Sequence, residues 1–144
     1  MLDSFGREIN YLRLSITDRC NLRCRYCMPE DGVAPTAHDD LLCYEELLRV
    51  AAVAVALGID RFKVTGGEPL VRRGCTDFIR ALKALPGVRQ VTLTTNGLLL
   101  VPLLDELCAT GLDGINISLD TLDNAQYQSL TRRAHTADEV LHAV

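Results

Sequence analysis

Short runs rich in β-branched residues alternate with longer helical patterns along most of this chain, and this alternation constrains the fold more than any other feature. Four short apolar or alternating runs predict strands. Three stretches with apolar residues at three- and four-residue intervals predict helices between the strands, and each is followed by Gly or Pro-Gly as a stop signal. The expected strands are 11–17, 60–65, 90–95 and 113–119, and the expected helices are 44–57, 75–85 and 99–110.

The resulting order is β-α-β-α-β-α-β, with two further helices predicted at 124–130 and from 136 onward. A repeated βα unit of roughly 30 residues is typical of a parallel sheet with right-handed crossovers. We therefore predict an α/β fold whose sheet is either open or curved into a barrel. With 144 residues and no linker or low-complexity tract, one domain is expected.

The composition excludes several functional classes. The chain carries 15 Lys and Arg against 19 Asp and Glu, a net charge of −4, and no basic block that would indicate a nucleic-acid or membrane surface. The first ten residues show neither a signal peptide nor a membrane anchor. The longest apolar run, 50–57, is too short to cross a bilayer and predicts a buried helix face instead. Six cysteines without a signal sequence favour a reducing compartment, by default the cytoplasm, and metal binding or catalysis rather than disulfides.

Polar and small residues follow each of the four predicted strands. Because parallel strands end at one edge of their sheet, and ligands bind along that edge, these residues are expected to lie near one another. They are Cys20, Cys24 and Cys27 after the first strand, Gly66, Gly67, Glu68 and Pro69 after the second, Asn96 and Gly97 after the third, and Ser118 and Asp120 at the fourth.

The three clustered cysteines, spaced C-x3-C-x2-C, allow several interpretations. A zinc site would need a fourth ligand, such as Cys43 or a more distant residue, and structural zinc sites commonly use two separated pairs. A thioredoxin-like redox pair leaves the third cysteine without a role. An iron–sulfur cubane bound by three thiolates fits better, because it leaves one iron open to a chelating ligand.

The cysteine triplet with Tyr26 before the third cysteine, followed by a GGEP segment after the next strand, resembles the radical S-adenosylmethionine (SAM) superfamily. The resemblance implies a partial TIM-type barrel in which Cys20, Cys24 and Cys27 hold three irons of a [4Fe-4S] cluster. SAM would bind the fourth iron through its amino and carboxylate groups. One-electron transfer would then cleave SAM to a 5′-deoxyadenosyl radical that abstracts hydrogen from the substrate.

The same resemblance implies further SAM contacts. Gly66 and Gly67 would let the backbone approach the methionine moiety, and Glu68 would accept from its ammonium group. Tyr26 would lie near the adenine, and Ser118 would contact the bound SAM. Taken singly, a Gly-Gly pair fits an ordinary loop and a serine after a strand fits ordinary solvation.

Within the superfamily, segments such as "VTGGEPLVRR", "LTTNGLLL" and "INISLDTLD" resemble GTP 3′,8-cyclases, the first enzymes of molybdenum cofactor biosynthesis. This resemblance implies a lyase that acts on GTP with an external electron donor, with Arg13, Lys63 and Thr94 as GTP contacts. Two cations aimed at one edge suit a triphosphate, although each alone fits an exposed strand charge. Lys63 stands where the family usually has Arg, so the charge is kept but the planar bidentate fork is lost.

Members of that family are more than twice as long and carry a second three-cysteine cluster near the C-terminus, which binds guanine. We therefore expect residues 1–144 to be a truncated radical SAM core without the C-terminal cluster domain: a fragment, a truncated product or one piece of a split enzyme. An unpaired sheet edge and an uncovered apolar face on the last helix are expected.

Two functional hypotheses follow: a GTP 3′,8-cyclase completed by a missing half or a partner chain, and a cluster- and SAM-binding module that is inert alone. A radical SAM enzyme acting on a peptide or tetrapyrrole is less consistent with Arg13 and the TTNGLLL segment. The remaining residues of interest are assigned no site. Cys43, Cys75 and Cys108 are predicted to pack in the interior, with Cys75 the one open to exposure; the Asp39-Asp40 pair is predicted to be a solvated loop; His38, His135 and His142 receive no role.

Overall fold

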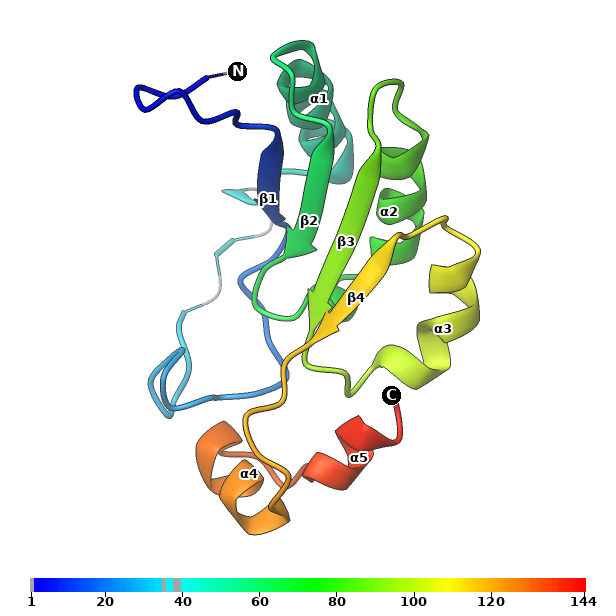
Figure 1. Cartoon of the computed structure of the whole chain (residues 1–144). Helices are drawn as coiled ribbons and strands as arrows, with labels where there is room; N and C mark the ends of the chain where they lie inside the picture. The colour runs from blue at the N-terminus through cyan, green and yellow to red at the C-terminus, as the bar shows by residue number, and fades with distance from the viewer. Residues whose placement is uncertain (1, 35, 38–39) are drawn as a thin grey trace.

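A single parallel sheet organises the chain. The computed structural model describes residues 2–34, 36–37 and 40–144. The sheet has the order β1-β2-β3-β4, with every neighbouring pair parallel, so the predicted α/β class is confirmed (Figure 1). The strands end within two residues of the predicted bounds, and they are β1 (Tyr11–Ser15), β2 (Arg61–Thr65), β3 (Gln90–Thr95) and β4 (Gly114–Ile117).

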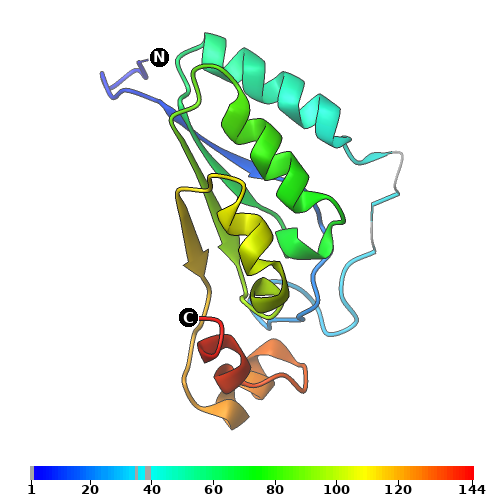
Figure 2. The same ribbon diagram turned by 90° about the vertical axis from the view of Figure 1, so that its right-hand side faces the viewer.

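The helices between the strands all lie on one face of the sheet (Figure 2). They follow the predicted positions because their apolar residues recur with the helical period and face the strands. A short 3-10 turn, η2 (Pro69–Val71), precedes the second of them. These helices are α1 (Tyr44–Ala56), α2 (Cys75–Ala84) and α3 (Leu100–Cys108), and two further helices, α4 (Asn124–Thr131) and α5 (Ala137–Leu141), follow β4.

The two faces of the sheet differ in chemistry. On the helix-covered face, alternate strand residues such as Phe62, Val64 and Leu93 are almost completely buried and form the main core. The alternate positions on the opposite face are polar and at least partly exposed: Arg13, Ser15, Lys63, Thr65, Thr92, Thr94 and Asn116. Period-two alternation thus gives a hydrophobic outer face and a polar inner face, as in the strands of an incomplete TIM-type barrel.

Helices α4 and α5 lie beyond the carboxyl ends of the strands rather than over the sheet (Figures 1 and 2). Tyr127 of α4 packs with Ala137 and Val140 of α5 in a small second core. The prediction of an uncovered apolar face on the last helix was therefore wrong for Ala137 and Val140, since α5 folds back against α4, whereas Leu141 is exposed. This pair of helices covers the same end of the sheet as the cysteine loop.

Three predictions about packing were wrong. The 50–57 run does not form a buried face: α1 buries Ala51 and Ala54, but Val50, Val53 and Leu57 are exposed, because only one side of this helix meets the sheet. Cys43 and Cys108 are exposed rather than packed.

For Cys75, the prediction that it packs in the interior is confirmed. Cys75 is buried in the main core, and not exposed, because it begins α2 on the side that faces the sheet. Asp40 is exposed, whereas Asp39 and His38 lie outside the described residues. No helix within the described ranges is long and apolar enough to cross a membrane.

An ion pair at the amino end of the sheet should make stability depend on pH. Burial alone would raise the pKa of Asp113, but hydrogen bonds from Lys83 Nζ (2.5 Å) and the Val91 backbone N–H (2.6 Å) outweigh it, so the pKa falls below 3.8. A lowered native pKa contributes stability above the unfolded pKa, and this contribution is lost as pH falls through the native value. In Asp113→Asn we expect about 1 kcal/mol less stability at pH 7, with the difference from the parent shrinking below about pH 4. Urea unfolding of the parent and the variant at pH 7 and pH 3 measures this difference in stability. An equal difference at both pH values would contradict a stabilising role of the ionised Asp113.

Candidate functional site

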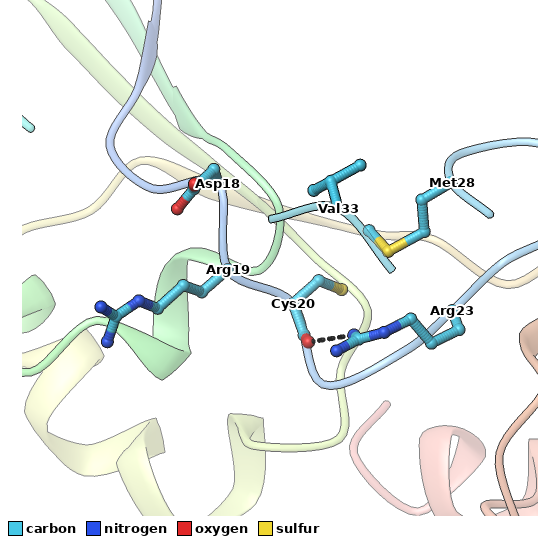
Figure 3. A pocket seen from close by; sticks show the side chains of 6 residues that line it. All are labelled: Asp18, Arg19, Cys20, Arg23, Met28 and Val33. Carbon is cyan, nitrogen blue, oxygen red and sulfur yellow. Dashed lines mark hydrogen bonds between the residues drawn. The ribbon is translucent and has the colours of Figure 1, made fainter. Parts of the chain in front are cut away.

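The cysteine loop directly follows β1 and is held by its own backbone. The Cys27 and Met28 N–H groups both donate to the Cys24 carbonyl, at 2.9 and 3.1 Å, so the C-x2-C pair occupies one tight turn. Arg23 Nη1 donates to the Cys20 carbonyl at 2.7 Å, which fixes the first cysteine relative to that turn (Figure 3). The three thiols are thereby presented from one compact loop.

The Gly66-Gly67 segment after β2 lies in direct contact with the start of the cysteine loop. The Gly67 N–H donates to the Thr17 carbonyl at 2.7 Å, and the Glu68 N–H donates to the Arg19 carbonyl at 2.8 Å. A Cβ on Gly67 would stand 2.3 Å from the Arg19 carbonyl oxygen, and one on Gly66 would stand 2.5 Å from that of Thr17. Apart from any ligand, both glycines are therefore required so that the two loops can meet.

Glu68 connects the ends of β2 and β3. Its side chain is 1 % exposed, and Oε1 accepts hydrogen bonds from the Leu70 N–H (3.0 Å) and the Thr95 hydroxyl (2.8 Å). Oε2 accepts from the Asn96 N–H at 2.7 Å. Burial raises the pKa of Glu68, and these three donors oppose the rise. The carboxylate therefore has a structural role in the cavity wall whether or not it also binds a ligand.

Replacing Glu68 with glutamine should weaken this wall. In either orientation of the amide, its NH2 group faces a backbone N–H, of Leu70 or of Asn96, which is left without an acceptor. We expect a loss of about 1–3 kcal/mol in the free energy of unfolding at pH 7, measured by urea titration. Glu106→Gln is the matched control, because among the described residues Glu106 accepts a hydrogen bond only from the Thr76 hydroxyl, which can act as acceptor instead. Equal stability of the two variants would contradict the assignment.

A cavity of about 290 Å³ opens where the four strands end. Ten of the eleven residues predicted to bind the cluster, SAM or GTP line this cavity. They come from the loops after the strands and from two positions within strands. Its lining consists of Arg13, Cys20, Leu22, Cys24, Tyr26, Cys27, Thr65, Gly66, Gly67, Glu68, Thr94, Thr95, Asn96 and Ser118.

Lys63 is the one predicted site residue that does not line this cavity. It is the register partner of Arg13, on the same polar face of the sheet, and Thr92 is the next position in that row. The two cations therefore lie side by side on neighbouring strands, and Arg13 is the one that reaches the cavity wall.

Several cavity residues carried a motif position but no assigned role in the sequence. Thr65, Thr95 and Asn96 line the cavity, and the Asn96 side chain also donates to Asn21 Oδ1 at 2.7 Å, which links the cysteine loop to the end of β3. Thr95 and Asn96 could have been identified from the TTNG segment, and Thr65 from its position as the last residue of a strand. The Tyr26 hydroxyl donates to the Asp120 carboxylate, and that bond raises the pKa of Tyr26. The aromatic position of the triplet is thereby tied to the segment after β4.

A second cavity, of about 320 Å³, adjoins Cys20 (Figure 3). Besides Cys20 it is lined by Asp18, Arg19, Arg23, Met28 and Val33. Arg23 donates hydrogen bonds to the Cys20 and Leu22 carbonyls, which hold its guanidinium group against the cysteine loop. Cys43, the candidate fourth zinc ligand, lines neither this cavity nor the one at the strand ends.

The chemistry of the donor set fits an iron–sulfur cluster. All six cysteines are free thiols, and burial raises the pKa values of Cys20 and Cys24. Among the residues that the structure describes, no three His, Cys, Asp or Glu side chains could surround one metal ion. A cubane is bound differently, because each cysteine takes a separate iron, and so the sulfurs need not converge on one point.

The family follows from a comparison with known proteins. The model of the radical SAM superfamily matches residues 14–144. This chain belongs to the radical SAM superfamily. The superfamily implies an iron–sulfur cluster and SAM, and the described cavity supplies three thiols beside a glycine-bounded pocket. BtrN, solved in complex with AdoMet and 2-DOIA, is similar in fold to this radical SAM chain, with a TM-score of 0.62 at 17 % identity over 92 % of this chain and 55 % of that one.

Curated relatives are more similar in sequence. The GTP 3′,8-cyclase of Geobacter sulfurreducens is 54 % identical over 132 residues, which are 92 % of this radical SAM chain and 40 % of that protein. Molybdenum cofactor biosynthesis protein 1 of Bos taurus is 49 % identical over 144 residues, 99 % of this chain and 23 % of that protein. The chain thus spans about two fifths or less of the length of these relatives.

Proposed function

We propose that this chain is the cluster- and SAM-binding N-terminal portion of a GTP 3′,8-cyclase of molybdenum cofactor biosynthesis. The observation that carries the proposal is the strand-end cavity, in which the cysteine triplet, the GG segment and Arg13 meet in a chain 54 % identical to a named GTP 3′,8-cyclase. On this proposal residues 1–144 form a radical SAM core, and the C-terminal cluster domain is supplied by further sequence or by a partner.

Each residue then has a physical task. Cys20, Cys24 and Cys27 would hold the [4Fe-4S] cluster, and the reduced cluster, when bound, would supply the electron that cleaves SAM. The GG segment would let the backbone approach the methionine part of SAM, and Ser118 would contact the bound SAM through its hydroxyl. Tyr26, oriented by Asp120, would lie beside its adenine.

Glu68 has less freedom than the resemblance implies. Because its two oxygens already accept three hydrogen bonds, at most one further acceptor position is free for the SAM ammonium group. Its contribution would then be mainly to hold the wall in place.

The triphosphate of GTP would bind to the polar face of the sheet. Arg13 and Lys63 are register partners there, and Thr94 lies on the same face at the cavity wall. Two adjacent cations provide charge-assisted hydrogen bonds to phosphate oxygens. Lys63 offers a point charge rather than a planar fork, so Arg13 would determine the orientation of the phosphates.

Anaerobic reconstitution tests this proposal. The chain is loaded with iron and sulfide, reduced with dithionite, and assayed for 5′-deoxyadenosine and for cyclised GTP. Conversion of GTP supports a cyclase that is complete in these residues. SAM cleavage with no conversion of GTP identifies the inert-alone module, and cleavage stimulated by a peptide or tetrapyrrole but not by GTP overturns the cyclase assignment. No uptake of iron overturns the cluster as well.

Arg13→Met separates GTP binding from cluster chemistry. We expect unchanged iron content but at least about tenfold weaker binding of GTP, since one charge-assisted hydrogen bond is lost. Arg49→Met is the matched control, because Arg49 lies on the exposed side of α1 and only approaches Glu46 at 3.8 Å. Isothermal titration with GTP measures both variants, and equal affinities would contradict the role of Arg13.

A further inference from the structure

The C-terminal end of α4 is hydrogen-bonded to the backbone of the cysteine loop (Figure 1). The Arg23 N–H donates to the Thr131 carbonyl at 2.9 Å. The Arg25 N–H donates to the Leu130 carbonyl, also at 2.9 Å. The last carbonyls of a helix have no partner within it, so the loop satisfies two of them. The two bonds lie on either side of Cys24 in the sequence, and they therefore hold the backbone that carries this thiol.

A third contact comes from the side chain of Arg132, the first residue after α4. Its Nη1 donates to the Met28 carbonyl at 3.1 Å. The N–H groups of Cys27 and Met28 both donate to the Cys24 carbonyl, so Met28 ends the tight turn that contains the C-x2-C pair. The end of α4 therefore holds this turn at its start through two carbonyls and at its end through one guanidinium group.

Arg132 stands at a backbone position where arginine is unfavourable. Its φ of 53° and ψ of 35° are left-handed, and its N–H ends the helix by donating to the Gln128 carbonyl at 2.8 Å. Glycine is the usual residue here, because the Cβ of an L-residue comes too close to the following carbonyl oxygen. Among the described residues, Arg132 is the only one other than glycine with a positive φ. Such strain is typical of functional sites, and here it accompanies a side chain that bonds to the cysteine loop.

We propose that Arg132 is a positioning residue of the cluster site: together with the end of α4, it clamps the turn that presents Cys24 and Cys27. This inference rests on the cluster of the proposed function but not on GTP as the substrate. Residues that orient metal ligands are typically worth 10–100-fold in metal affinity, although they do not touch the metal. The clamp joins the loop after the first strand to the helix after the fourth, so the cysteine turn is ordered only when the whole sheet has folded.

Two substitutions separate the side chain of Arg132 from its backbone strain. Arg132→Gly removes the guanidinium group and relieves the strain, whereas Arg132→Met removes the guanidinium group and keeps the strain. In urea unfolding, Arg132→Gly should therefore be the more stable of the two variants. In both variants we nevertheless expect the Cys27 and Met28 amides of the apo chain to exchange hydrogen about tenfold faster than in the parent, because a charged donor to the turn is lost.

The reconstituted chain gives a second measurement. Both variants should lose iron to a chelator under anaerobic conditions at least about tenfold faster than the parent. Arg132→Lys keeps a cationic donor on the same backbone, and since only one hydrogen bond is made, it should restore slow exchange and slow loss of iron. Arg133→Met is the matched control. The exposed Arg133 donates only to the neighbouring Arg132 carbonyl, at 3.0 Å, among the described residues, so this variant should match the parent.

The outcomes separate a clamp from a general effect on stability. Fast exchange and fast loss of iron in both Arg132→Gly and Arg132→Met, with Arg132→Lys and Arg133→Met close to the parent, support the proposal. An effect confined to Arg132→Met overturns it, because backbone strain alone would then explain the result. Fast exchange without faster loss of iron, or no rescue by Arg132→Lys, also overturns it. Failure of the unmodified chain to bind iron would instead overturn the cluster assignment itself.

Discussion

Cys24→Ala is expected to abolish cluster binding while leaving the fold intact. Mutations of groups that merely support a metal ligand typically cost 10–100-fold in metal affinity, so loss of a ligand should cost at least about 100-fold. The side chain of Cys24 belongs to neither hydrophobic core. We therefore expect the free energy of unfolding of the apo chain to change by no more than about 0.5 kcal/mol. Iron and sulfide analysis after anaerobic reconstitution, with the absorbance of the cluster, measures the effect.

Cys108→Ala provides the control for this experiment. Cys108 is also a free thiol, but it is exposed at the end of α3 and does not line the strand-end cavity. It should retain the full iron content and the same yield of 5′-deoxyadenosine as the parent. A Cys24→Ala chain that binds as much iron and sulfide as Cys108→Ala would show that Cys24 is not a ligand.

Gly67→Ala should damage the site and the fold together. The new Cβ would lie 2.3 Å from the Arg19 carbonyl oxygen and 2.9 Å from that of Asp18. Because both are backbone atoms, the loops must separate, which strains the Gly67–Thr17 and Glu68–Arg19 hydrogen bonds. Overpacking costs about 1–3 kcal/mol and each lost hydrogen bond about 0.5–1.5 kcal/mol, so we expect the free energy of unfolding in urea to fall by roughly 2–6 kcal/mol. Cluster uptake should fall as well, because the cysteine loop shifts.

Gly114→Ala is the matched control for that variant. Gly114 lies in β4 on the polar face of the sheet, and its new Cβ would meet only Thr92 Cγ2, at 3.8 Å, an ordinary contact. Its stability should change by less than about 1 kcal/mol. If Gly67→Ala unfolds at the same urea concentration as Gly114→Ala, the close approach of the two loops is not a requirement of the fold.

Local sequence patterns were enough to locate the elements of this protein. Alternation with period two predicted the strands, and the Gly and Pro-Gly stop signals predicted the helix ends. The observed bounds therefore differ from the expected ones by only a few residues. The same patterns failed for the 50–57 run and for Cys43 and Cys108, whereas Cys75 packs in the core as predicted. Hydropathy reports what a residue would prefer, whereas burial depends on which side of its helix meets another element.

The candidate site was also predictable from the sequence only in part. The sequence by itself determined that three thiols, two glycines and several polar groups follow parallel strands, and a parallel sheet must bring those ends together at one edge. Only the tertiary structure decided how they are held. Glu68 is occupied by Leu70, Thr95 and Asn96, the glycines serve a loop-to-loop contact, and the end of α4 accepts backbone hydrogen bonds from the cysteine loop. These contacts join residues up to about a hundred positions apart, and no local periodicity encodes a pairing over such separations.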